Sequence, residues 1–231
     1  MKRHTPKIIS DLYHRAVRIS YRLKSRKARF VDIYNLNAFG GTESISGPGS
    51  SLEQTVALRK ELPGVIRDFN IRKIIDAPCG DFHWMKEVVL DLDTYIGIDI
   101  VPELILANRV KFGNNKREFY VKDIVKDPLP QGDLILCRDC FIHLSYKDIF
   151  STMRNFHKSG TKYLFTTTFT GQKDNTDIVS GRVRPLNLQR PPFNFPVPLL
   201  LINEHCTEGE GNYSDKSLGF WEIAEIQKKF S

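Results

Sequence analysis

Residues 74–82 read IIDAPCGDF, and this stretch decides the fold of the 231-residue chain. Two isoleucines precede the acidic residue Asp76, and Pro78 and Gly80 follow it, which predicts a buried strand that ends in a tight turn. In an α/β sheet such a turn presents backbone N–H groups and a small-residue surface to a ligand. The candidate ligand-binding residues are Asp76, Pro78, Cys79, Gly80 and Asp81.

Short apolar runs rich in β-forming residues continue along the chain after this turn. Strands are predicted at residues 72–76, 94–99, 118–123, 133–137 and 162–168. Helices are predicted near residues 84–90, 102–112 and 146–158. Strands that alternate with helices predict an α/β fold with a mostly parallel sheet. Two later apolar runs, 199–203 and 217–226, are expected to pair as a hairpin at the sheet edge.

The carboxylates at the ends of the second and third strands narrow the class of ligand. Asp99 closes the second strand, 23 residues after Asp76, where a carboxylate can accept hydrogen bonds from both hydroxyl groups of a ribose. Asp123 follows the third strand and is placed to bind an adenine amino group, with Ile100 and Ile124 as apolar walls. The sequence therefore predicts a cleft for an adenosine-containing ligand.

This set of residues resembles the motifs of class I S-adenosylmethionine-dependent methyltransferases, whose first loop usually reads Asp/Glu-x-Gly-x-Gly-x-Gly. Gly80 matches the middle glycine, whereas Pro78 and Phe82 replace the outer two. The replacements count more against a dinucleotide, because a pyrophosphate needs the close backbone approach that glycine permits. A sulfonium ligand carries no phosphate and tolerates them.

Further segments resemble small bacterial enzymes of this class that are often associated with surface-polysaccharide biosynthesis. These segments read SGPGSSLEQT, DAPCGDFHWM, YIGIDIVPELI, DLILCRDCFIHLS, YLFTTTF, RPLNLQRPPFNFP and DKSLGFWEI, and they cover nearly everything from residue 40 to residue 226. The resemblance implies a Rossmann-like methyltransferase sheet of strand order 3-2-1-4-5-7-6, with helices on both faces and S-adenosyl-L-methionine as cofactor. Arg138, which follows the fourth strand, is a further candidate for cofactor binding.

A glycine-rich stretch, GGTESISGPGSS at residues 40–51, precedes the first strand. Ser46, Gly47 and Ser50 are candidates for a lid over the methionine end of the cofactor, and a plain surface loop is the alternative.

A capping box is expected directly after this stretch. Ser51 and Gln54 are expected to cap a helix over residues 52–62, and Pro63-Gly64 is expected to end it.

The chemistry is expected beyond the fourth strand, where residues 136–144 read LCRDCFIHL. Methyl transfer is an in-line displacement, so the enzyme must align an acceptor and take up any released proton. His143 is interpreted as the base and Asp139, four residues earlier, as the residue that orients it if the segment is helical. The alternative is that both residues serve as caps or core contacts.

Metal independence is the expectation for this site. The pair Cys137 and Cys140 lacks a second Cys/His pair at a suitable distance for zinc. A divalent ion held by Asp139, Asp174 and Asn175 is the alternative, but Asp174 lies several residues beyond the expected strand end.

The acceptor is expected to bind the proline-stiffened segment at residues 182–196. The rings of Phe193 and Phe195 alternate with Asn194, a pattern that suits the apolar faces and hydroxyl groups of a sugar. Arg184 is a candidate for an anionic group on the acceptor. Alternatively, the prolines brace a crossover connection.

The net charge of +7 is concentrated at the start of the chain. Residues 1–30 hold ten Lys or Arg against one acid, and residues 31–231 hold 24 against 26. Apolar residues at helical spacing between residues 8 and 27 predict a basic amphipathic helix. This helix could pack on the domain, dock peripherally on the anionic inner face of a membrane, or bind nucleic acid, which is the least favoured partner.

The composition bounds the organisation of the chain. With 41% hydrophobic and 26% charged residues, the length suits one α/β domain rather than two. The expected organisation is an N-terminal arm at residues 1–39 and a methyltransferase domain at residues 40–231. No apolar stretch approaches the roughly 20 residues that span a membrane, and the start lacks the apolar core of a secretory signal, so a cytoplasmic protein with reduced cysteines is expected.

The sequence thus predicts an O-methyltransferase that acts on a hydroxyl group of a saccharide or another small acceptor. One alternative is a methyltransferase of nucleic acid or a small metabolite. A second alternative, from a different class, is a non-catalytic cofactor-binding scaffold.

Overall fold

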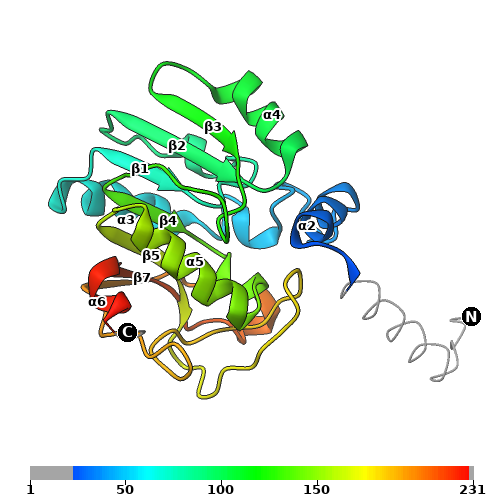
Figure 1. Ribbon diagram of the computed structural model, residues 1–231, viewed down its shortest axis with the longest axis vertical. Coiled ribbons are helices and arrows are strands. Elements are labelled where there is room, and N and C mark those ends of the chain that lie inside the picture. Colours follow the sequence, from blue (N-terminus) through cyan, green and yellow to red (C-terminus); the bar gives the residue numbers. More distant parts are fainter. Residues whose placement is uncertain (1–22, 229–231) are drawn as a thin grey trace, which may run out of the picture.

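The computed structural model describes residues 23–228. Its core is a seven-stranded sheet in the order β3-β2-β1-β4-β5-β7-β6, with helices on both faces (Figure 1). The strands are β1 Lys73–Asp76, β2 Thr94–Asp99, β3 Arg117–Val121, β4 Leu134–Cys137, β5 Tyr163–Phe169, β6 Leu200–Asn203 and β7 Lys216–Glu222. The predicted fold class and strand order are confirmed.

The helices of the described residues connect or flank these strands. They are α2 Arg26–Asn35, α3 Val56–Asp68, α4 Pro102–Phe112, α5 Tyr146–Lys158 and α6 Ile223–Gln227. Single 3₁₀ turns lie at Pro48–Ser50, Met85–Glu87, Phe141–His143 and Glu208–Gly211. The predicted bounds of α4 and α5 are confirmed, whereas the helix predicted near residues 84–90 is reduced to the short turn at Met85–Glu87.

The two faces of the sheet carry separate hydrophobic clusters, because successive residues of a strand point to opposite faces. Ile74 of β1 packs in the cluster that contains residues of α3 and α4, and Ile75 packs in the cluster that contains residues of α5 and α6. Both isoleucines are fully buried. The apolar run in β1 is therefore that of a central parallel strand covered on both faces.

The antiparallel edge of the sheet is also as predicted. β6 pairs with β7, and β7 pairs with β5, both in antiparallel register. The predicted run 217–226 is divided, because β7 ends at Glu222 and α6 begins at Ile223.

The structure corrects the start of the helix predicted at residues 52–62. The hydroxyl group of Ser51 accepts the backbone N–H of Gln54 at 3.2 Å, so a local cap forms. The residues between them form turns, however, and α3 begins only at Val56.

The expectation that Pro63-Gly64 ends this helix is wrong, since α3 continues through both residues to Asp68. Proline removes one intrahelical hydrogen bond and glycine costs backbone entropy. Burial of an apolar stripe outweighs these costs. The buried residues of the stripe are Leu58, Leu62, Val65 and Ile66.

The amphipathic helix predicted in the arm lies mostly outside the described residues. The prediction that this helix extends through Lys27 is wrong. Ser25, which is among the first described residues, adopts an extended conformation and caps a new helix, α2. The Ser25 hydroxyl group accepts the N–H of Ala28 at 3.2 Å.

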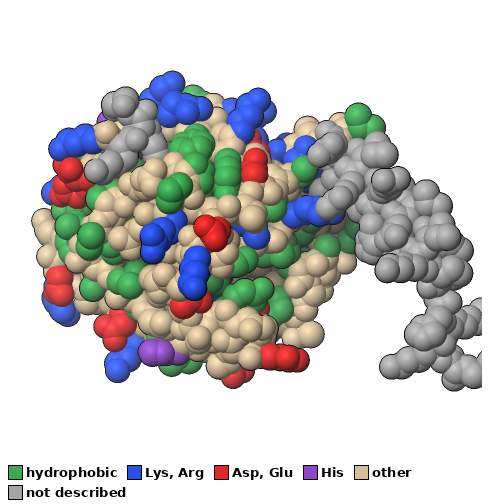
Figure 2. All heavy atoms as spheres, turned by 90° about the horizontal axis from the view of Figure 1, so that it is seen from below, with side chains coloured by type: hydrophobic (Ala, Val, Ile, Leu, Met, Phe, Trp, Pro, Cys, Tyr) green, Lys and Arg blue, Asp and Glu red, His purple; other side chains and the backbone are tan. Residues whose placement is uncertain are grey.

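One face of the molecule shows how the charges of the body are arranged. Figure 2 shows Lys and Arg side chains interspersed with acidic and hydrophobic ones on this face. Within residues 23–228, no helix is both long and apolar enough to cross a bilayer.

The unusual glycine inside α3 gives a stability prediction. A Cβ atom added at Gly64 would meet only the guanidinium end of Arg67 at 3.8 Å, which is ordinary contact. Gly64→Ala should therefore raise the free energy of unfolding by ~0.5–1 kcal/mol, measured by urea denaturation. Gly41→Ala is the matched control and should destabilise, because its Cβ atom would lie 1.7 Å from the Ser44 carbonyl oxygen. Destabilisation by Gly64→Ala would contradict the packing of α3.

Candidate functional site

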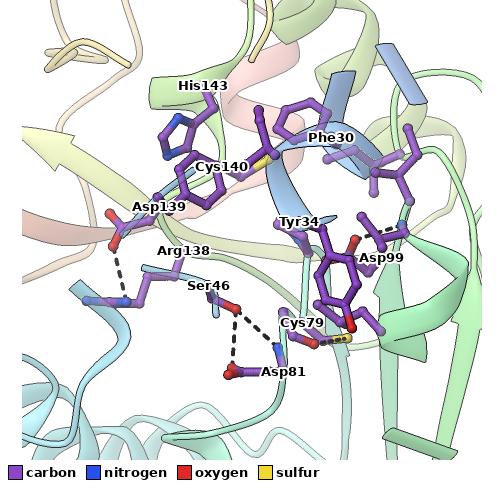
Figure 3. A pocket seen from close by; sticks show the side chains of 18 of the residues that line it. Phe30, Tyr34, Ser46, Cys79, Asp81, Asp99, Arg138, Asp139, Cys140 and His143 are labelled. Carbon is purple, nitrogen blue, oxygen red and sulfur yellow. Dashed lines mark hydrogen bonds and ion pairs between the residues drawn. The ribbon is translucent and has the colours of Figure 1, made fainter. Parts of the chain in front are cut away.

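The main pocket lies at the carboxyl ends of the parallel strands. β1 pairs with β2 on one side and with β4 on the other, so the loops that leave β1 and β4 diverge above the sheet. Figure 3 shows side chains from these loops and from α2 around the pocket. Its lining includes the predicted residues Asp76, Pro78, Cys79, Gly80, Asp81, Asp99, Ile100, Asp123, Ile124, Arg138, Asp139 and His143.

The turn after β1 needs glycine at position 80. Gly80 has a φ of +53°, and a Cβ atom there would lie 2.3 Å from the hydroxyl oxygen of Ser46. The turn is fixed from below by the N–H of Cys79, which donates to the carbonyl of Ile98 at 2.8 Å. Asn108 of α4 donates its amide to the carbonyl of Gly80 at 2.8 Å. The backbone of the turn is therefore held rigid at the floor of the pocket.

The glycine-rich stretch is fastened to this turn through Asp81. The Asp81 carboxylate accepts the hydroxyl groups of Ser44 at 2.9 Å and of Ser46 at 3.2 Å, and also the backbone N–H of Ile45 at 3.0 Å. Asp81 thus anchors the loop, although it was predicted to bind the cofactor. Ser46 and the buried Ser50 line the pocket, and their closure over a ligand stays a prediction.

Gly47 takes a different place from the one predicted. It does not line the pocket, and its φ of +107° lets Phe39 lie against it, since a Cβ atom would be 3.2 Å from that of Phe39. Gly47 therefore supports Phe39, which itself lines the pocket.

Asp99 is a buried carboxylate whose hydrogen bonds come from the backbone. Its Oδ1 atom accepts the N–H of Val101 at 3.0 Å, and the amides of Gly80 and Ile100 also stabilise the charge. Burial outweighs these bonds and raises the pKa of Asp99 to about 6. A ligand that donates hydroxyl groups to this carboxylate would favour its ionised form.

Asp76 is buried more deeply, beneath the turn. The hydroxyl group of Tyr95 donates to its Oδ2 atom at 2.5 Å. Burial raises the pKa of Asp76 to about 7, against the lowering effect of that bond. A cationic ligand above the turn would restore the ionised carboxylate.

The two apolar residues predicted to flank an adenine near Asp123 lie in the pocket. Ile100 and Ile124 both line the pocket. Asp123 lines it as well, but its carboxylate is bound by Arg26 through Nη2 at 2.5 Å and Nε at 3.2 Å. The sequence gave no indication of this partner, because Arg26 lies 97 residues earlier in the predicted arm.

His143 carries a lone pair that can take up a proton. Its Nδ1 atom lies 2.9 Å from the carbonyl oxygen of Arg182, and because a carbonyl only accepts, Nδ1 bears the hydrogen and Nε2 is left as the base. The ring of Phe39 lies 4.7 Å from the imidazole. Burial lowers the pKa of His143 below its ordinary value, so the ring is neutral at pH 7.

Asp139 does not orient His143 as predicted. Its carboxylate binds Lys216 at 2.7 Å and Arg138 at 3.1 Å, and no hydrogen bond joins it to His143 among the described residues. The segment forms a single 3₁₀ turn only at Phe141–His143, and Asp139, which precedes this turn, has a φ of +48°. The expected helical spacing between Asp139 and His143 is therefore absent. The Arg182 carbonyl holds the imidazole instead.

Arg138 belongs to a buried ionic network rather than standing free in the pocket. Its guanidinium binds Glu204 at 2.6 Å and the carbonyl of Gly49 at 2.7 Å. Lys216 completes the network at 3.2 Å from Glu204. Burial opposes the ionisation of Asp139, but Arg138 and Lys216 outweigh it and lower its pKa to about 2. Asp139 therefore stays charged throughout the physiological range.

The structure contradicts the predicted acceptor residues. Phe193 and Phe195 are buried in the hydrophobic cluster beneath α5, and the guanidinium of Arg184 donates to the carbonyls of Phe141 and Leu144. None of the three lines the pocket, and the exposed Asn194 does not line it either. The aromatic residues alternate with polar ones because this segment packs one face on the core, as a bracing connection does.

The pocket also contains residues that the sequence did not single out. Five of them come from the predicted arm: Arg26, Phe30, Ile33, Tyr34 and Phe39. Their only sequence signal is the apolar spacing of Phe30, Ile33 and Tyr34, which is typical of a helix that packs on a domain.

A metal site is not formed by the described residues. Within residues 23–228 there is no group of three or more His, Cys, Asp or Glu side chains that could hold an ion. Asn175 donates its amide to the carbonyls of Asn187 and Pro191, away from Asp139.

Comparisons with known proteins find similarity only at the level of structure. No protein-family model matches the sequence, and no curated protein matches it significantly. One similar structure is magnesium protoporphyrin IX methyltransferase from Synechocystis PCC 6803, solved with bound S-adenosylmethionine, at 14% identity over 67% of this chain and 81% of that chain, with a TM-score of 0.48.

Two further structures are similar to shorter parts of the chain. The methyltransferase domain of bacterial CtHen1-CN shares 12% identity over 50% of this chain and 66% of that chain, with a TM-score of 0.45. The sugar N-methyltransferase KedS8 from Streptoalloteichus sp ATCC 53650 shares 16% identity over 57% of this chain and 55% of that chain, with a TM-score of 0.43. The fold class therefore rests on the strand order of the sheet itself.

The tautomer of His143 is directly measurable. Nitrogen-15 NMR of the imidazole at pH 7 should show the hydrogen on Nδ1 and a free Nε2, and the titration midpoint should lie below 6.5 because burial disfavours the imidazolium. His157 is the internal reference, since it lies in the last turn of α5 outside the pocket. A protonated Nε2 at pH 7 would contradict the geometry of the site.

Proposed function

We propose that this chain is an S-adenosylmethionine-dependent methyltransferase that methylates a hydroxyl group of a small acceptor, most specifically a saccharide. The observation that carries the proposal is the cleft between β1 and β4, where the order of the strands reverses. Asp99 lies in this cleft, and the neutral imidazole of His143 lies in the same pocket. A strand order alone defines a fold, whereas these two side chains define a site.

The residues of the pocket fit an adenosyl group. Asp99 is buried and, within residues 23–228, accepts hydrogen bonds from backbone donors only, so ribose hydroxyl groups could supply further partners to its carboxylate. Ile100 and Ile124 offer apolar walls for a base, and the rigid turn at Gly80 offers a floor. Asp76, whose pKa is raised to about 7 by burial, favours a cationic ligand above it.

When bound, S-adenosylmethionine supplies a methyl group on a sulfonium, a good leaving group for in-line attack. The chain's own contribution is to align the acceptor oxygen and to receive its proton at Nε2 of His143 as the new carbon–oxygen bond forms. The Arg182 carbonyl then stabilises the imidazolium through the Nδ1 hydrogen. Phe39, which lies against the imidazole, keeps water from the base.

A saccharide acceptor is supported by the surroundings of His143. The ring of Phe39 offers an apolar face, and the permanently charged Asp139 offers an acceptor for hydroxyl groups. Together they suit a ligand with apolar C–H faces and polar edges. This assigns the acceptor to a wall made by the arm and the loop after β4, not to residues 182–196.

The activity itself is the first test. Purified protein supplied with S-adenosylmethionine and nucleotide sugars or a glycan extract should produce S-adenosylhomocysteine steadily, and His143→Gln should lower kcat by roughly 10²–10⁴. The same variant should bind S-adenosylhomocysteine as the wild type does. Cofactor binding without turnover on these acceptors, nucleosides or RNA would favour the scaffold alternative.

The pH dependence of cofactor affinity is the second test. Because ribose hydroxyl groups bind the ionised form of a carboxylate whose pKa is about 6, the Kd for S-adenosylhomocysteine should rise about tenfold as the pH falls from 7.5 to 5. Asp99→Asn should bind more weakly at pH 7.5 and show a flatter profile by calorimetry. Equal affinities of Asp99→Asn and wild type at pH 7.5 would refute the role of Asp99.

A further inference from the structure

Helix α2 forms one wall of the cleft, although its residues belong to the predicted arm. The residues of α2 that line the pocket are Arg26, Phe30, Ile33 and Tyr34. Figure 1 shows the helix beyond the carboxyl ends of the strands. The wall therefore stands over the loops that carry Asp99 and Asp123.

Arg26 fastens the first turn of α2 to both sides of the cleft. Its Nη2 and Nε atoms bind the two oxygens of Asp123, and its Nη1 atom binds Asp148 of α5 at 2.8 Å. The three side chains retain only 16%, 8% and 17% of their exposure, respectively. Bidentate ion pairs that are largely shielded from water hold more strongly than surface pairs do.

A second contact ties α2 to the same region. Arg29 donates from Nη1 to the carbonyl of Ser180 at 3.0 Å, and the hydroxyl group of Ser180 donates to the other oxygen of Asp148 at 2.5 Å. The start of α2, the start of α5 and the loop at Ser180 thus form one polar cluster.

Tyr34 carries a hydroxyl group to which the described residues offer no hydrogen bond. Figure 3 shows Tyr34 and Phe30 pointing into the pocket beside Asp99. The Tyr34 side chain is half-buried, and its hydroxyl group forms no hydrogen bond with any residue between 23 and 228. An aromatic ring with a free hydroxyl group at this position is suited to the face and the polar edge of a nucleoside.

We infer that α2 is a closing wall of the cofactor subsite, in which Tyr34 contacts the adenosyl group and Arg26 holds the wall shut through Asp123 and Asp148. This inference rests on the proposed function. It adds two residues to the cofactor site and makes the release of the cofactor depend on an ion pair.

The hydrogen bonds of Asp123 explain the dependence. Oδ1 accepts both the Nε–H of Arg26 and the N–H of Val125, so its lone pairs are used. Oδ2 accepts one bond from Arg26 and keeps one lone pair, which is the only place left on this carboxylate for an adenine amino group. Adenine and Arg26 would therefore share Asp123, and α2 can move away from the bound cofactor only if Arg26 leaves Asp123 and Asp148.

The test is the rate at which S-adenosylhomocysteine leaves the full-length protein, followed by stopped-flow displacement with excess S-adenosylmethionine. Arg26→Ala should release it about tenfold faster than wild type, because three charge-assisted hydrogen bonds are lost. Arg26→Lys should fall between them, since one ammonium group cannot reproduce the fork geometry. Tyr34→Ala should raise the Kd several-fold, and Tyr34→Phe should show the part that is due to the hydroxyl group.

Lys24→Ala is the matched control. It removes a cation two residues before Arg26. Lys24 pairs with Asp32 at 2.5 Å, the pair is exposed and neither residue lines the pocket, so the release rate should equal that of wild type. Release from both Arg26 variants within threefold of wild type, or unchanged affinity in Tyr34→Ala, would overturn the inference. A wild type that binds no S-adenosylhomocysteine would refute the proposed function itself.

Discussion

The parallel pairing of β1 between β2 and β4 is the constraint on which the rest of this structure depends. The register sets Ile74 beside Tyr95 on one side and beside Leu134 on the other, so the three strands end at the same edge of the sheet. That alignment brings Asp76, Asp99 and Asp139 into one pocket, because each residue lies at or just beyond the end of one of these strands. A cleft forms at this edge because the strand that follows β1 lies on one side of the β1–β4 pair, whereas the strand that follows β4 lies on the other side.

The electrostatics of the cleft divide it into two halves. On the side of β1 and β2, burial raises the pKa values of Asp76 and Asp99 to about 7 and about 6, and no basic side chain of the described part of the chain forms a hydrogen bond with either. On the side of β4, Arg138 and Lys216 hold Asp139 ionised within a buried network. The first half suits a ligand that donates hydrogen bonds and carries positive charge, whereas the second half keeps its carboxylate ionised by an internal network whether or not a ligand is bound.

The sequence predicted the elements that depend on local pattern, and it failed where distant segments decide. Most of the strands and the turn at Gly80 follow from periodicity and local pattern, whereas the strand order came from the family resemblance. The placement of His143 in the pocket was also expected, and its role as a base stays a prediction. The rings of Phe193 and Phe195 could not be placed, because alternation with polar residues fits an exposed wall and a buried brace equally well. The role of Arg26 depends on carboxylates 97 and 122 residues away, which no local pattern reveals. Pro63 likewise ends a helix only where packing does not outweigh its cost.

The central claim is that the turn after β1, the carboxylate of Asp99 and helix α2 together enclose an adenosyl group. The most direct measurement is a crystal structure of the protein grown with S-adenosylhomocysteine. The ribose hydroxyl groups should lie on Asp99, the base between Ile100 and Ile124, and the ring of Tyr34 against the nucleoside. An empty cleft at saturating ligand, or a ligand bound elsewhere on the sheet, would contradict it.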